Sequence, residues 1–118
     1  MKRIETFESA KDSGKTFDEL KINHTLYWAY MTAMETGNDL IDFNEVIWDY
    51  DIQPIVEECR ALGIEKFTIS STFSSLIPIL AEFEKQGCKM EGLTQVKSRH
   101  TDWRTGERAE IPAILMSL

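Results

Sequence analysis

The sequence predicts one small domain of the α+β class, in which helices come first and a β-α-β crossover and a C-terminal β-hairpin follow. The chain has 118 residues, 42% of them apolar, with only six Gly and three Pro, which suits a single domain with its own core. Apolar residues in the first half recur at spacings of three and four, which is typical of helices. Three strand-like runs, separated by turn residues, follow after residue 65.

Residues 1–15 are polar and mixed in charge, with no sustained hydrophobic period. We therefore expect a loosely held N-terminal tail, with no more than one short turn or edge strand at Ile4–Phe7. The single α+β domain is expected to cover residues 16–118.

A long helix is predicted to start at Thr16, which forms a capping box with Glu19. Apolar side chains continue at helical spacing up to Gly37, whose missing Cβ suits the left-handed residue that closes a helix. His24 occupies a core position in this pattern. The helix is apolar on two sides and must be covered on both, by its own domain or by a partner. We expect it to contribute to a homodimer or larger homo-oligomer. If Ile22, Leu26 and Ala33 are all buried within one chain, it is instead a central helix.

The middle of the chain is more ambiguous. Asp42 and Glu45 repeat the capping signal and predict a short helix with Tyr50 facing inward, while a strand is the competing interpretation. The following helix is better marked, because Pro54 fits its first turn and Gly63 can close it.

The second half predicts a small mixed sheet packed with helices. The two strands of the crossover should be parallel and the hairpin antiparallel. Pro112 has no N–H to donate to a neighbouring strand, so it should lie at an edge of the sheet, at a bulge, or with its nitrogen pointing away from the neighbouring strand. The expected elements are a strand at Lys66–Ser70, a helix capped by the serine-rich loop and ending at Gly87, a strand at Lys89–His100, a turn at Arg104–Glu107 and a strand at Glu110–Ser117.

The formal charge of −7 is unevenly distributed. The 37 residues from Asn23 to Cys59 contain no Lys or Arg and eight acids, whereas the rest of the chain has 13 basic and 12 acidic residues. Such a segment repels duplex nucleic acid and attracts a protein partner with a basic surface. Solvated acids at helix starts are the simpler explanation. The residues of this possible partner surface are Glu35, Asp39, Asp42, Glu45, Asp49 and Asp51.

A second possible site combines a hydroxyl-rich loop at 70–75 with a basic hairpin at 97–108. Hydroxyls that leave a strand and enter a helix can hold an anion, and cations beside an aromatic residue suit a phosphate. The ordinary interpretation is that the serines cap a helix and that the hairpin carries cross-strand ion pairs. The candidate residues are Ser71, Thr72, Ser74, Arg99, His100 and Arg104.

Metal, cofactor and membrane functions are not indicated. Cys59 and Cys88 lack the paired spacing of a zinc site, and the D-x-D of Asp49 and Asp51 lacks the other members of a calcium loop. We expect no cofactor and no catalytic metal. No apolar run approaches the length of a membrane span or of a signal-peptide core, so we expect a cytoplasmic protein with reduced thiols.

The stretches WDYDIQPIVEECRALGIEKFTISS and GCKMEGLTQVKSRHTDWRTGERAEIPAILMSL resemble a family of small bacterial proteins of unknown function that often occur among genes of mobile elements. The resemblance implies an accessory role and no particular site residue. No catalytic motif is complete, so the sequence does not identify an enzyme. We expect a non-enzymatic binding or accessory protein whose acidic segment docks a basic partner; the alternative is a small enzyme or nucleotide- or anion-binding protein that uses the loop and the hairpin.

Overall fold

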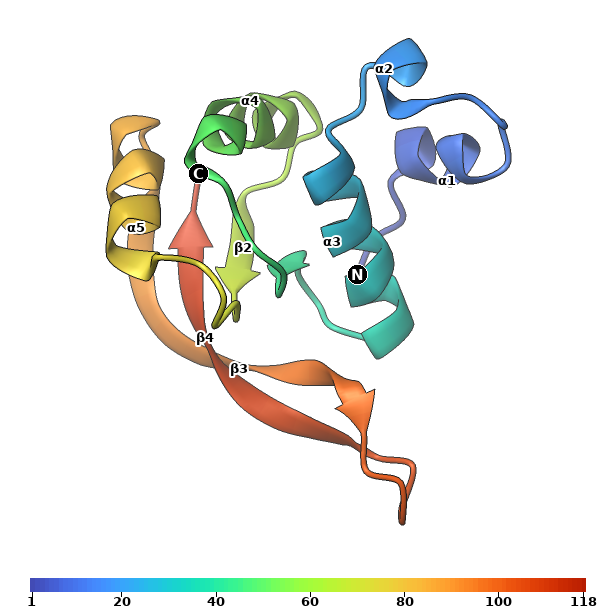
Figure 1. Cartoon of the computed structure of the whole chain (residues 1–118), viewed down its shortest axis with the longest axis vertical. Coiled ribbons are helices and arrows are strands. Elements are labelled where there is room, and N and C mark those ends of the chain that lie inside the picture. The colour runs from blue at the N-terminus through green and yellow to red at the C-terminus, as the bar shows by residue number, and fades with distance from the viewer.

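The computed structural model describes residues 1–118 and confirms the α+β class. Helices occupy most of the first half, and a four-stranded mixed sheet is completed by a long C-terminal hairpin (Figure 1). The elements are α1 (Glu5–Lys11), α2 (Phe17–Leu20), α3 (His24–Thr36), β1 (Asp42–Phe43), the 3-10 turn η1 (Asp49–Asp51), α4 (Ile52–Ala61), β2 (Lys66–Ile69), α5 (Leu76–Lys85), β3 (Lys89–Thr101) and β4 (Arg108–Ser117).

The strands lie in the order β1-β2-β4-β3. β1 pairs with β2 in parallel, and β4 pairs antiparallel with both β2 and β3. β2 and β3 are therefore parallel to each other, as the crossover predicts, but β4 lies between them. β2 ends at Ile69 opposite Ile114, so Pro112 has a partner only on the β3 side, where it faces Gln95. The lack of an amide proton at this proline is tolerated because β4 has no second neighbour there.

The core packs the sheet against helices α4 and α5 and also includes buried residues of α1 and α3. The Phe67 ring of β2 contacts Phe43 of β1 edge-on, with ring centroids 5.4 Å apart, and contacts Phe83 of α5 at 5.2 Å. All three rings are buried. Each removes its apolar surface from water, which is worth roughly 2 kcal/mol per side chain, so these rings hold α5 and β1 to the central strand.

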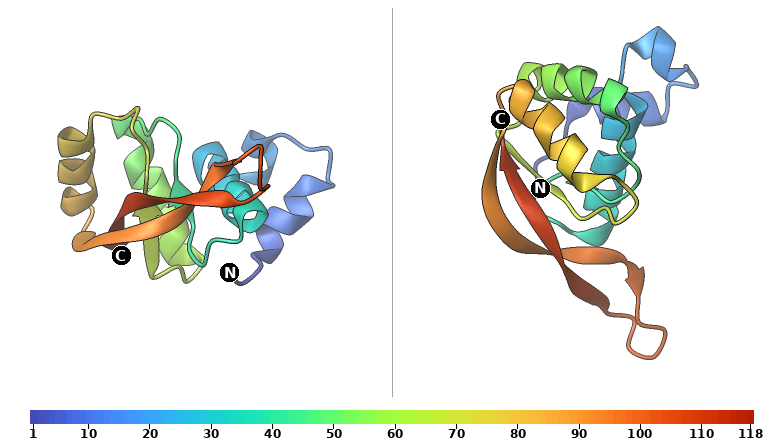
Figure 2. Two further views of the ribbon diagram at one scale, coloured as in Figure 1. Left: turned by 90° about the horizontal axis from the view of Figure 1, so that it is seen from below. Right: turned by 60° about the vertical axis from the view of Figure 1, so that its left-hand side comes forward.

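Helix α3 packs beside β1, and the segment after it binds the hairpin. The Asn38 side chain accepts a hydrogen bond from the Lys97 backbone N–H at 2.8 Å and donates one to the Lys97 carbonyl at 3.1 Å. The Asn38 side-chain amide thus bonds both backbone groups of Lys97, as a residue of a neighbouring strand would. Beyond this point the hairpin leaves the body of the molecule, and its tip stands away from all the helices (Figures 1 and 2).

The expected helix from Thr16 to Gly37 is two helices. Thr16 does cap α2, accepting a hydrogen bond from the Glu19 N–H at 3.2 Å, but α2 ends after one turn because Lys21 adopts a left-handed conformation, with φ of 55°. The Asn23 side chain then caps α3 by accepting a hydrogen bond from the Leu26 N–H. A second strong cap inside the periodic pattern divides it. Gly37 closes α3 as expected, with φ of 76°.

The expected N-terminal tail with a turn or strand at Ile4–Phe7 is a helix that belongs to the core. Phe7 of α1 is fully buried and lies against Tyr27 and Tyr30 of α3, with ring centroids 5.9 and 5.2 Å away. The Tyr30 hydroxyl donates to the Glu8 carboxylate at 2.7 Å and accepts from the Ile4 N–H at 3.1 Å. One aromatic side chain and two hydrogen bonds thus fix a segment whose sequence has no visible period.

The two apolar sides of α3 are covered by the same chain. Ile22, Leu26 and Ala33 are buried in the monomer. Their pattern is that of a central helix and does not indicate a contact between copies.

The segment after α3 forms a strand, which is the competing interpretation of the sequence. Asp42 and Phe43 form a short strand rather than a helix start, and Tyr50 is exposed rather than inward-facing. The capping pattern is misleading because the Asp42 side chain bonds to the neighbouring strand, not to its own backbone.

We expect Phe7→Ala to destabilise the protein by about 3 kcal/mol, because it empties a site between two buried tyrosines. Trp103→Ala, which truncates an aromatic ring at the exposed hairpin tip, is the matched control and should alter the free energy of unfolding by less than about 0.5 kcal/mol. Urea unfolding followed by circular dichroism measures both. Equal effects of the two substitutions would show that α1 is not anchored by Phe7.

Candidate functional site

The acidic segment divides into buried structural acids and exposed ones. Asp42 is only 3% exposed; its Oδ1 accepts a hydrogen bond from Thr68 Oγ1 and its Oδ2 accepts one from Ser70 Oγ, both at 2.6 Å. Burial raises the pKa of Asp42, and the two hydroxyls act in the opposite direction. The carboxyl group joins β1 to β2 and to the loop that follows β2. This corrects the expectation that Asp42 belongs to a partner surface.

Asp51 and Glu58 are also engaged inside the chain. Asp51 is buried and accepts a hydrogen bond from Thr25 Oγ1 at 3.4 Å, so it too is removed from the expected surface. Glu58 accepts from the Asn23 N–H at 2.9 Å, and burial raises its pKa. Both acids connect the start of α3 to η1 and α4.

The exposed acids do not share one hollow. Glu45 lines a cleft beside α3, and Asp49 is exposed and follows the cleft residue Trp48 in the sequence. Asp39 lines a different hollow, near the N-terminus, and Glu35 lies near the end of α3. The net charge of the acidic segment is therefore spread over the molecule, and Glu45 is the one acidic residue in the lining of the cleft.

The cleft has two tryptophans in its lining, and we call it the two-tryptophan cleft. Its volume is about 350 Å³. Trp28 projects from α3 and Trp48 from the segment that leads into η1, and both side chains remain more than half exposed. The full lining is His24, Thr25, Trp28, Ala29 and Thr32 of α3, Phe43, Asn44, Glu45, Val46 and Trp48 after it, and Arg99 of β3.

Charged and aromatic groups are organised at this cleft. Arg99 of β3 forms an ion pair with Glu45. The Trp48 ring stacks on Tyr50, with centroids 6.4 Å apart and planes within 5° of parallel. Exposed indole and phenol faces attract cations, and the carboxylates of Glu45 and Asp49 add to that attraction. The arrangement suits a guanidinium or ammonium group, of which Arg99 is the example within the chain.

Several cleft residues were not expected to be functional. The helical pattern predicts that His24 and Tyr50 are buried, but both are exposed in the structure. The break at Lys21 explains His24, because it turns the start of α3 away from the position it would hold in one long helix. The signal that could have identified the cleft is the pair of aromatic residues interleaved with acids in Trp48-Asp49-Tyr50-Asp51.

The serine-rich loop has mainly structural contacts. Ser71 is buried and accepts a hydrogen bond from the Phe73 N–H, while Ser74 accepts one from the Ile47 N–H at 2.8 Å. The two hydroxyls also bond to each other at 3.2 Å. Thr72 is exposed. The loop thereby supports the segment that carries Trp48.

The basic hairpin residues lie apart from the serines. Arg99 lines the two-tryptophan cleft, and none of the serines does. His100 is exposed further along β3, and Arg104 lies over the Trp103 ring at the hairpin tip, 5.4 Å from its centroid. The loop and the hairpin therefore do not form the joint anion site that their sequence suggested.

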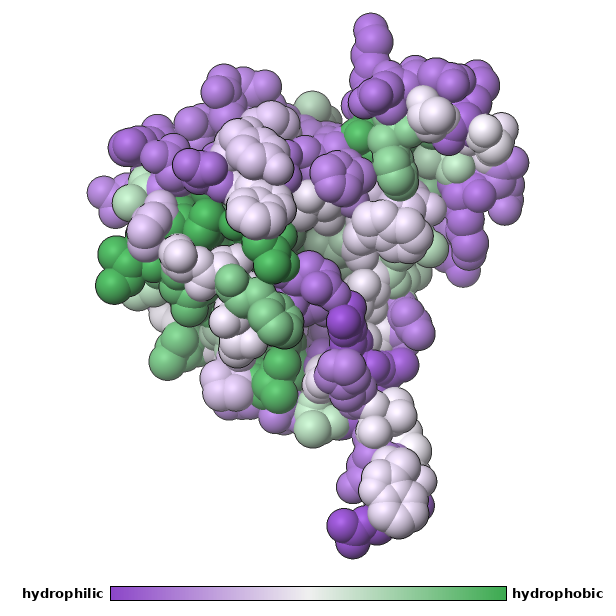
Figure 3. All heavy atoms as spheres, in the orientation of Figure 1, coloured by the Kyte–Doolittle hydropathy of each residue, from purple (hydrophilic) through white to green (hydrophobic).

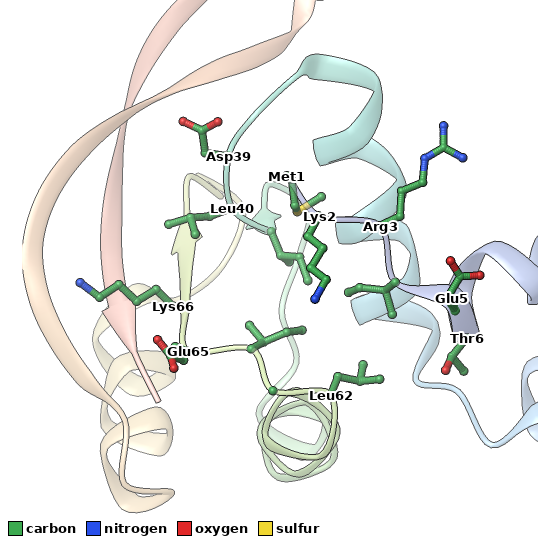
Figure 4. A pocket seen from close by; sticks show the side chains of 14 residues that line it. Met1, Lys2, Arg3, Glu5, Thr6, Asp39, Leu40, Leu62, Glu65 and Lys66 are labelled. Atoms are coloured by element: carbon green, nitrogen blue, oxygen red, sulfur yellow. The ribbon is translucent and has the colours of Figure 1, made fainter.

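A larger hollow of about 580 Å³ lies between the N-terminal segment, the 39–41 segment and the α4–β2 turn. Figure 4 shows side chains from all three segments around it, with Leu40 and Leu62 on its apolar walls. Three of its side chains are cationic and three are acidic, so the side-chain charges cancel; they are Lys2, Arg3, Lys66, Glu5, Asp39 and Glu65.

The two cysteines are free and buried. Burial, together with the neighbouring Glu58, raises the pKa of Cys59 to about 12, and burial also raises the pKa of Cys88. Thiols in such surroundings are poor nucleophiles. No three His, Cys, Asp or Glu side chains are grouped so that they could hold a metal ion.

Fold and site together define a small α+β domain with an exposed aromatic cleft. The chain belongs to a family described as a domain of unknown function (DUF7698), which matches residues 25–118. This agrees with the resemblance to a family without an assigned function. The matched region contains the whole sheet and every lining residue of the cleft except His24. No curated protein and no solved structure matches the chain. None of its helices is both long and apolar enough to pass through a bilayer.

We expect Asp42→Ala to destabilise the fold by about 2 kcal/mol, because it leaves the hydroxyls of Thr68 and Ser70 without their acceptor. Asp39→Ala removes a carboxylate of the same kind from an exposed position and should cost less than about 0.5 kcal/mol. Chemical unfolding of both variants at neutral pH provides the comparison. A change no larger than that of Asp39→Ala would mean that the buried carboxyl does not hold β1 to β2.

The raised pKa of Asp42 also predicts a pH dependence. The native state binds the proton of the Asp42 carboxyl group more tightly than the unfolded chain does. In the unfolded chain the pKa of this group is near 3.8. The stability that the group contributes is therefore fully present below about pH 4 and is lost as the pH rises through the raised native pKa. Asp42→Asn cannot titrate, so between about pH 4 and 7 the wild type should lose stability relative to this variant. Parallel pH profiles would contradict the raised pKa.

Proposed function

We propose that the protein is a non-enzymatic accessory protein that binds an Arg- or Lys-bearing segment of a protein partner in the two-tryptophan cleft. The observation that carries the proposal is the exposed pair Trp28 and Trp48 in one hollow with Glu45, beside the exposed ring of Tyr50. Large aromatic side chains left in water are costly unless a partner covers them, and they are enriched at binding hot spots.

The ion pair between Glu45 and Arg99 supports a cationic occupant. It joins the segment after β1 to β3, and both side chains are about half exposed, so water screens the pair and its contribution is small. A partner arginine that also stacks on an indole face gains a cation–π contact of about 1 kcal/mol. Such an arginine would compete with Arg99 for Glu45.

Charge supports the same class of partner. The acidic segment carries no Lys or Arg, and Asp49, which directly follows Trp48, is exposed. Long-range attraction raises the association rate of a basic segment, and aromatic contacts then provide the specificity. In contrast, most hydroxyls of the serine-rich loop are used within the chain, so no contact favours the anion-binding or enzymatic alternative.

Because the chain resembles bacterial proteins encoded near mobile elements, we also propose that it is a cytoplasmic accessory protein of that class. Self-association is part of the proposal, through a surface other than α3, whose apolar residues are buried.

The test uses hexa-arginine as the probe, with hexa-glutamate as the negative control, in a Trp103→Phe background that leaves Trp28 and Trp48 as the only indole reporters. We expect hexa-arginine to change their fluorescence and to bind more weakly as salt is raised. Trp48→Ala should weaken binding about fivefold, which corresponds to one cation–π contact.

Two further variants give effects of opposite sign. Glu45→Gln should weaken hexa-arginine binding about fivefold, whereas Arg99→Ala should strengthen it, because it removes the internal competitor. Asp39→Asn makes the same charge change as Glu45→Gln in a different hollow and should have little effect. If Asp39→Asn weakens binding as much as Glu45→Gln, the attraction comes from net charge alone and the proposed site is wrong.

A further inference from the structure

A second set of large apolar side chains in water belongs to α5, the loop before it and β3. Phe73 in the loop before α5, Ile77 of α5, and Met90 and Leu93 of β3 are large apolar side chains in water, with Ile77 81% and Leu93 79% exposed. We call these four residues the α5–β3 patch. Figure 3 shows apolar side chains gathered over this part of the molecule. The patch shares no residue with the two-tryptophan cleft.

A β-bulge produces this patch. Met90 and Leu93 are three residues apart, so a regular strand would place them on opposite faces. The register shifts between Met90 and Gly92, however, and the cross-strand partners of Met90 and Leu93 are Met116 and Ile114. These two residues of β4 also pair with Phe67 and Ile69, which are buried on the helix side. The extra residue therefore turns both apolar side chains toward α5.

The patch contains a recess beside its projecting side chains. A groove of about 790 Å³ runs between α5 and the start of β3, with Ile77 and Met90 in its lining. Projecting and recessed parts within one surface are what a two-fold contact between identical copies requires, because each copy offers both.

The charged residues that line the groove favour a second copy of this chain as its occupant. The groove has two charged residues in its lining, Glu84 and Lys89, which have opposite signs, and neither takes part in an ion pair within the chain. A two-fold arrangement can bring Glu84 of each copy to Lys89 of the other. The chain as a whole carries −7, so two copies repel each other over most of their surfaces. The neutral α5–β3 patch is a place where they can meet without that repulsion.

We propose that the protein forms a two-fold homodimer through the α5–β3 patch, with reciprocal Glu84–Lys89 ion pairs at its rim. The proposal rests on the self-association included in the proposed function and names the surface for it. Peptide binding at the two-tryptophan cleft is tested separately, so either can fail without the other.

Sedimentation equilibrium over about 1–200 µM tests the dimer, in the range expected for an interface of modest size. We expect the wild type to dimerise and Ile77→Glu to raise the dissociation constant at least about tenfold, because it places a charge at the centre of an apolar contact. Leu93→Glu is a second variant with the same expected effect. Trp103→Glu makes an equivalent change at the exposed hairpin tip and should leave the dimer unchanged. Circular dichroism and thermal unfolding confirm that each variant folds.

A charge swap tests the two-fold arrangement. Glu84→Lys alone and Lys89→Glu alone should each raise the dissociation constant about fivefold, because each creates like-charge contacts. The double variant, Glu84→Lys with Lys89→Glu, should return it to within about twofold of the wild type. A monomeric wild type at the highest concentration, a dimer indifferent to both Ile77→Glu and Leu93→Glu, or a double variant without recovery would each overturn the proposal. A monomeric wild type would indicate that the α5–β3 patch binds a different kind of partner.

Discussion

The position of the candidate cleft depends on the buried carboxyl group of Asp42. Its two oxygens accept hydrogen bonds from Thr68 and Ser70, and these bonds fix the two-residue strand β1 against β2, where only a short ladder is available. The chain that leaves β1 carries Glu45 and Trp48, so their positions depend on this connection. Ser74 then holds the Ile47 amide. Burying an acid in an apolar core costs free energy, and here two hydroxyl donors at 2.6 Å offset part of that cost, since the pKa of Asp42 remains raised.

The acidic segment combines two roles that its composition does not separate. Asp42, Asp51 and Glu58 accept hydrogen bonds inside the chain and connect elements that are distant in sequence. Glu45 and Asp49 remain at the surface beside exposed aromatic rings. Some of the carboxylates in this segment therefore stabilise the fold, and others are free to contact a partner. The number that can contact a partner is smaller than the formal charge suggests. Aromatic exposure, rather than charge, distinguishes the cleft from the other hollows.

The long hairpin serves both proposed surfaces. Near its base, the bulge at Glu91–Gly92 turns Met90 and Leu93 toward α5 and creates the α5–β3 patch. Further along, Asn38 binds the Lys97 backbone, and Arg99 two residues later reaches Glu45. An edge strand of this length is open to unwanted pairing. The bulge and the side-chain amide of Asn38 both interrupt its regular edge, which limits that hazard.

Sequence alone determined the features that depend on neighbours along the chain. Local propensity and periodicity predict the α+β class, the end of α3 at Gly37, the helix with Pro54 in its first turn, the β2 strand and the β3–β4 hairpin. Only the tertiary structure decided the burial of Phe7 against α3, the strand at Asp42, the insertion of β4 between β2 and β3, and the exposure of His24, Trp48 and Tyr50. The physical reason is that burial and strand pairing depend on partners many residues away. Such partners can outweigh a local capping signal or a hydrophobic period.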